Sequence, residues 1–155
     1  PETTLTVVTD PQRSVLGVDW DEQGRMRWRY ASAEGTAEAT LAGLRRGSLD
    51  PTAAARALAT ARSLASVEEA RLVVLEAEGR SASASLLLPA SGIDVAAELL
   101  RRGLVPLDLT DRGVLAHQPT LVIVALLARR DPRLAQSPAL ADESYLRALD
   151  GLLGR

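Results

Sequence analysis

The sequence contains no cysteine and a single histidine, His117. The lack of cysteine excludes disulfide scaffolds, thiolate zinc sites, iron–sulfur clusters and cysteine nucleophiles. All 18 cationic side chains are arginine, which excludes Schiff-base lysines and the lysine of phosphate-binding P-loops. Phenylalanine is also absent and aromatic residues make up 3% of the chain, so the core must be built from alanine, leucine and valine.

The composition that remains is typical of a globular protein. Hydrophobic residues make up 46% and charged residues 25% of 155 residues, which predicts a single domain over residues 1–155. A net charge of -2 means that the chain does not bind nucleic acid or acidic membranes by net charge alone. The longest apolar run, Leu121 to Ala128, is far shorter than the ~20 residues of a membrane span. We therefore expect a cytoplasmic protein without a membrane partner.

Three strands are expected near the start of the chain, at residues 5–9, 15–20 and 25–30. The third alternates strictly between basic and apolar residues, which is typical of a strand with one buried face. A three-residue loop that ends at Gly24 would join the second strand to the third. This loop fixes a register with acids opposite bases and apolar residues opposite apolar residues. The predicted pairs are Asp21–Arg25, Asp19–Arg27, Gly17–Arg29, Trp20–Met26, Val18–Trp28 and Leu16–Tyr30.

Helices and further strands alternate in the rest of the chain. Asp50 followed by Pro51 predicts a capped helix that runs to about Ala65. Pro119 and the length of the segment favour a helix over a strand at residues 119–130. The other expected helices cover residues 36–46, 91–102 and 137–153, and the other expected strands cover 71–77, 81–85 and 104–109. The order predicts an α/β fold with a mixed sheet that begins with an antiparallel three-stranded meander and is flanked by helices.

This order of elements resembles the ribonuclease H-like superfamily. The first strand with its Asp10, the third strand, the helix that contains Glu38 and the strand that ends at Glu76 are similar to that family's pattern. The resemblance implies that Asp10, Glu38 and Glu76 are catalytic residues that bind Mg²⁺ or Mn²⁺. Two such metals stabilise the attacking and leaving oxygens when a phosphodiester of hybrid or structured nucleic acid is hydrolysed.

Each of these acids also has a structural interpretation. Asp10 is an ordinary residue for a strand end, and Glu76 lies near a turn. Glu78 lies near the same turn and is the alternative to Glu76 as a metal ligand. Glu38 would lie in a first helical turn, where the helix dipole favours acids. A variant of the same fold that resembles Holliday-junction resolvases would use Asp19 instead. The hairpin register pairs Asp19 with Arg27, which favours a structural role.

The three arginines of the third strand form a second candidate site. Arg25, Arg27 and Arg29 lie on one face of that strand, at a spacing that suits the phosphates of a nucleic-acid strand. The alternative is a solvated face whose charge is neutralised by Asp19 and Asp21. His117 is not accompanied by the serine motif of a hydrolase triad, so a structural role is favoured.

These features leave three functional hypotheses. The first is a metal-dependent nuclease, and the second is a catalytically inactive relative that binds nucleic acid or a protein. The third is an interaction or assembly module, expected to be a homodimer. A shared architecture does not decide among them, because fold does not fix function.

Overall fold

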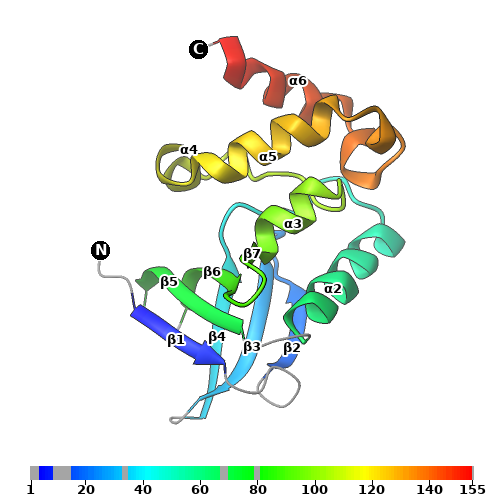
Figure 1. Ribbon diagram of the computed structural model, residues 1–155. Coiled ribbons are helices and arrows are strands. Elements are labelled where there is room, and N and C mark those ends of the chain that lie inside the picture. The colour runs from blue at the N-terminus through cyan, green and yellow to red at the C-terminus, as the bar shows by residue number, and fades with distance from the viewer. Residues whose placement is uncertain (1–3, 9–14, 33–34, 67–69, 79–80, 155) are drawn as a thin grey trace.

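The computed structural model describes residues 4–8, 15–32, 35–66, 70–78 and 81–154 (Figure 1). The strands are β1 (Thr4–Val8), β2 (Val15–Trp20), β3 (Met26–Ser32), β4 (Gly35–Leu41), β5 (Ala70–Glu78), β6 (Ser81–Leu88) and β7 (Ile93–Asp94). The helices are α2 (Pro51–Ala65), α3 (Val95–Arg101), α4 (Arg112–His117), α5 (Pro119–Arg130) and α6 (Glu143–Gly151). Short 3₁₀ turns cover Pro132–Leu134, Pro138–Ala141 and Leu152–Gly154.

The hairpin of β2 and β3 has the register that the charge pattern predicted. The confirmed cross-strand pairs are Gly17–Arg29, Val18–Trp28, Asp19–Arg27 and Trp20–Met26. The pair of Leu16 with Tyr30 was predicted wrongly: the register shifts between Val15 and Gly17, so Val15 lies opposite Tyr30. The apolar face of β3 is buried as expected, because Met26, Trp28 and Tyr30 all belong to the core.

The turn of this hairpin is held by Asp21. Its carboxylate accepts hydrogen bonds from the backbone N–H groups of Gln23 at 2.8 Å and Arg25 at 2.9 Å. The backbone N–H of Asp21 donates to the carbonyl of Arg25, which confirms that these two residues face each other. Gly24 has a φ of 76°, the left-handed conformation that glycine adopts without steric cost.

The helix expected at residues 36–46 does not form. Residues 35–41 are strand β4, which pairs antiparallel with β3. Ala39 and Leu41 are buried, whereas Glu38 between them is half-buried on the other face of the strand. This period of two matches a sheet with one covered face. Packing of the small apolar face against the core therefore outweighs the helix propensity of alanine, glutamate and leucine.

The strands form one mixed sheet in the order β1-β5-β6-β4-β3-β2, and β7 pairs with β6. Every pair is antiparallel except β4 with β6, which is parallel. The expected α/β class with a mixed sheet is confirmed. The meander, however, consists of β2, β3 and β4, because β1 lies at the opposite edge beside β5.

The chain takes a non-sequential path through this sheet. A three-stranded meander is followed by helix α2, and the hairpin β5–β6 then returns so that β6 lies parallel to β4. Strands that are far apart in the sequence therefore lie beside each other.

Helices cover the sheet from one side and one end. Figure 1 shows α2 beside β2, and it shows α4, α5 and α6 as a separate layer beyond α3. Residues 119–130 are helical, as favoured, and Asp50 caps α2 by accepting from the backbone N–H of Ala53 at 2.8 Å. Within the described residues, none of these helices combines the length and the apolar character that a bilayer crossing requires.

Two expected elements of the C-terminal half are wrong. Residues 104–109 are not a strand, and of these residues Leu107 alone forms a bridge, to Leu44. The helix expected at 137–153 is interrupted at Asp142, which caps α6 by accepting from the backbone N–H groups of Ser144 and Tyr145. Pro106 and the local capping by Asp142 account for these breaks.

Candidate nucleic-acid interface

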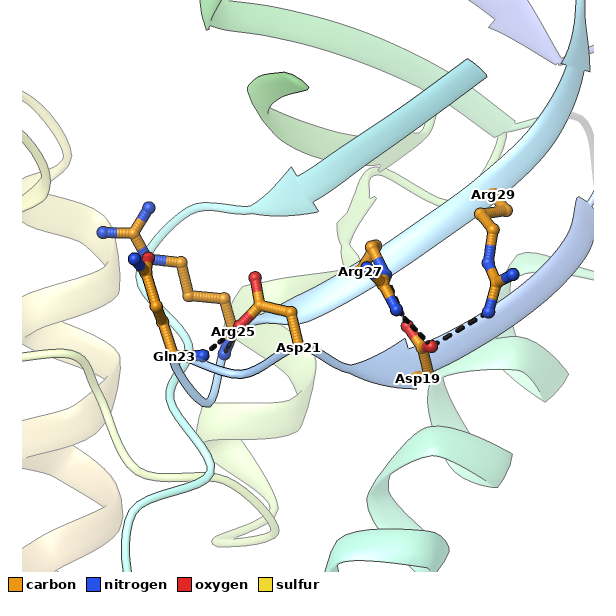
Figure 2. Close-up of polar contacts among 6 residues, drawn as sticks. All are labelled: Asp19, Asp21, Gln23, Arg25, Arg27 and Arg29. Carbon is orange, nitrogen blue, oxygen red and sulfur yellow. Dashed lines mark hydrogen bonds and ion pairs between the residues drawn. The ribbon is translucent and has the colours of Figure 1, made fainter. Parts of the chain in front are cut away.

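The face formed by the polar sides of β2, β3 and β4 carries the predicted arginine row. We call Asp19, Arg27, Arg29 and Glu38 the hairpin face. Arg27 donates to both carboxylate oxygens of Asp19, from Nε at 2.9 Å and from a terminal nitrogen at 2.7 Å. Arg29 donates to the same carboxylate at 2.9 Å. Figure 2 shows Asp19 between the two guanidinium groups. The pair of Asp19 with Arg27 was predicted, whereas the diagonal contact with Arg29 was not.

This ion-pair network shifts the pKa values of Asp19 and Arg27. The hydrogen bond from Arg27 holds the pKa of Asp19 below its ordinary value, and the charge of Arg29 acts in the same direction. The hydrogen bond with Asp19 raises the pKa of Arg27, and the negative charge of Glu38 adds to that effect. Asp19 and Arg27 are therefore both ionised near neutral pH. Asp19 is thus engaged with the predicted partner Arg27 and, in addition, with Arg29.

Glu38 lies on this face and not in a helix. Its Cα is paired with that of Arg29 across the ladder of β3 and β4. The prediction that Glu38 lies in a first helical turn is therefore wrong, because the residue belongs to a strand whose other face is buried. Two carboxylates and two guanidiniums occupy the hairpin face, so its formal charge is balanced.

Arg25 is separated from the other two arginines. Its side chain is exposed and, in Figure 2, extends away from Arg27 and Arg29. Asp21, which lies between, uses its carboxylate on the backbone of the turn. The three arginines therefore do not present a continuous row of unpaired cations, which is the arrangement that phosphate contacts along a strand require.

The predicted metal ligands are only partly described. Asp10 lies outside the described residues, as do the side chains of Glu76 and Glu78. The backbone of β5 shows that Val8, at the end of β1, pairs with Ala70, whereas Glu76 pairs with Ser83. Six residues of strand separate Ala70 from Glu76, or about 20 Å. Within the described part of the chain, no three histidine or acidic side chains lie close enough to hold a metal ion.

Sequence reasoning missed a buried acid, Asp108, which is 4% exposed. Its carboxylate accepts from the backbone N–H of Thr110 at 3.0 Å and from the hydroxyl of Thr110 at 2.6 Å. Arg45 lies 3.7 Å away, and the backbone N–H of Asp108 donates to Gly43. The sequence feature that could have indicated this contact is the spacing of Asp108 and Thr110, because an aspartate two residues before a threonine favours a local turn. The contacts of Asp108 give it a structural role, and the hollow beside it, about 10 Å³, barely holds a water.

Comparison with known proteins shows a likeness in fold. The sequence matches no protein-family model and no curated protein. Among solved structures, the extended Tudor domain of Drosophila melanogaster Tudor-SN (p100) is similar, with a TM-score of 0.54 and 18% sequence identity. The likeness covers 73% of this chain and 63% of that chain, so it spans less than two thirds of that structure. The chain is similar in fold to an extended Tudor domain, and at this identity the likeness shows the fold alone.

Proposed function

We propose that this domain is a non-catalytic interaction module that binds a protein partner. The observation that carries the proposal is the engagement of Arg27 and Arg29 by Asp19 on the hairpin face. Binding to nucleic acid depends on cations that displace the counterions of phosphates. A face with balanced charges instead fits a protein surface, where complementary charges of both signs provide specificity.

Exposed apolar residues in the C-terminal helices support the same proposal. Ile123 and Leu127 are 56% and 63% exposed and lie one turn apart on α5. The other large apolar side chain that is exposed among the described residues is Leu153, which follows α6. Apolar groups that share a helix face and point to solvent are typical of protein-docking surfaces.

The nuclease hypothesis and the ribonuclease H-like resemblance stay predictions, as does the magnesium or manganese site of Asp10, Glu38 and Glu76. Direct binding of nucleic acid by the arginine row and the formation of a homodimer also stay predictions. The protein-binding proposal is preferred because it depends on contacts of described residues, whereas the metal site depends on two side chains outside them.

The proposal predicts that the wild-type domain does not bind or cleave nucleic acid. Labelled single-stranded RNA, double-stranded DNA and an RNA–DNA hybrid would be titrated at about 50 and 150 mM salt with Mn²⁺ present. We expect dissociation constants no tighter than about 10⁻⁴ M at the higher salt concentration, which is the weak end of non-specific binding. Salt-dependent binding well below that value would contradict the proposal, and so would cleavage that Asp10→Asn abolishes.

A further inference from the structure

A groove between α2 and α3 lies apart from the hairpin face. It has a volume of about 450 Å³ and is lined by Arg56, Ala59, Thr60, Ser63 and Leu64 of α2 and by Arg102 at the end of α3. Figure 1 shows the two helices side by side. The groove is open to solvent along the surface of the two helices.

The groove carries a net positive charge. Arg56 is exposed and has no acidic partner within ion-pair distance among the described residues. Arg102 donates from Nε to Glu98 at 2.9 Å, and among the described residues its two terminal nitrogens have no recorded acceptor. Glu98 is also bound by Arg101, so one carboxylate offsets only one of two cations. Of the two arginines that line the groove, Arg56 has no described acidic partner and Arg102 shares Glu98 with Arg101, so the groove keeps a net positive charge.

The remaining walls determine the kind of anion that fits. Thr60 and Ser63 contribute hydroxyl groups, whereas Ala59 and Leu64 form an apolar wall. From Arg56 to Ser63 the helix advances about 10 Å, which corresponds to three extended peptide residues. Among the described residues, the lining contains no aromatic side chain on which a base could stack, and two cations provide few phosphate contacts. These features favour a peptide over a nucleic acid.

We propose that the α2–α3 groove binds an acidic peptide segment of a partner protein. Carboxylates of the segment pair with Arg56 and Arg102, whose planar guanidiniums match carboxylates in two-pronged hydrogen bonds. An apolar side chain between these carboxylates contacts Ala59 and Leu64. This inference rests on the proposed function, because it names the chemistry of one protein segment that the module recognises.

Selection from a random peptide display library tests the groove directly. Peptides of about ten residues, long enough to cover the groove, would be selected on the wild-type domain. We expect the bound peptides to be enriched at least about threefold in aspartate and glutamate, with an apolar residue between acids. An unenriched selection, or no selection at all, would overturn the inference.

Affinity measurements with a selected peptide assign the binding to the two arginines. We expect Arg56→Glu and Arg102→Ala each to weaken binding at least about tenfold, because each removes charge-assisted hydrogen bonds. Arg147→Ala, which removes an exposed arginine of α6, is the matched control and should leave the affinity unchanged. Arg56 is exposed, so the variant should fold, which its thermal unfolding checks.

Two further outcomes separate this inference from the proposed function. In the Arg56→Glu variant, a peptide with lysines in place of its acids should bind better than it does to the wild type. Equal affinity of wild type and Arg56→Glu for the acidic peptide would overturn the assignment of peptide binding to the groove. The proposed function would stand, because it is tested separately by the nucleic-acid titrations. Competition by a uridine oligonucleotide that depends on Arg56 would instead assign the groove to nucleic acid.

Discussion

Replacing Gly103 with alanine is expected to lower the free energy of unfolding by about 2–4 kcal/mol. Gly103 ends α3 with a φ of 67°, and its N–H donates to Leu100 while that of Leu104 donates to Leu99. This is the Schellman arrangement, in which glycine avoids left-handed strain. A Cβ at Gly103 would also lie 2.3 Å from the hydroxyl oxygen and 2.8 Å from the Cβ of Ser137. The segment that precedes α6 would have to move away from α3.

Gly92→Ala is the matched control for this prediction. Gly92 has a similar φ of 75°, but nothing lies within 4 Å of the position its Cβ would take. The control should therefore show the left-handed strain alone, about 1 kcal/mol. Urea denaturation of both variants measures the difference. If Gly103→Ala were no less stable than Gly92→Ala, the close approach of residue 137 to α3 would be refuted.

Replacing Leu149 with alanine is expected to destabilise the domain by about 2–5 kcal/mol, through lost burial and the cavity that remains. Leu149 is 0% exposed and belongs to the same core cluster as the buried residues of β3, β4 and α3. Leu153→Ala makes the same chemical change at a side chain that is 54% exposed, so its effect should stay within about 0.5 kcal/mol. Equal stability of the two variants would mean that α6 does not contribute to the common core.

The sequence analysis succeeded where neighbours in the chain are also neighbours in space. The register of β2 and β3 follows from a short loop and from opposite charges such as Asp19 and Arg27, and both features are local. Helix α2 likewise follows from Asp50 and Pro51 at its start. These elements could be predicted because their turn, cap and face patterns agree with one another.

The errors arose where distant contacts decide the structure. Residues 36–41 have the composition of a helix, but the burial of Ala39 and Leu41 on the covered face of the sheet favours a strand. The position of β1 beside β5 depends on pairing across more than 60 residues, which no local pattern specifies. Glu38 was expected on a helix and lies on a strand instead, whereas the metal site that combined it with Asp10 and Glu76 stays a prediction.

The two candidate binding surfaces also differ in whether local or distant contacts form them. The neutralisation of the arginine row by Asp19 was considered from the sequence, because Asp19 and the arginines belong to one hairpin. The α2–α3 groove was not, because Arg56 and Arg102 are 46 residues apart and meet only when the helices pack. Arg102 is the last residue of the helix expected at residues 91–102, and its position beside α2 becomes evident only in the folded structure.

The most direct test of the central claim is a nucleic-acid titration of Asp19→Asn beside the wild type. If Asp19 neutralises the hairpin face, its loss should free Arg27 and Arg29 and strengthen binding to single-stranded RNA at least about tenfold, with a steeper dependence on salt. Asp150→Asn removes the same charge from α6, where Arg129 lies 3.4 Å away, and should produce no comparable gain. Unchanged binding by Asp19→Asn, or tight binding by the wild type, would contradict the account.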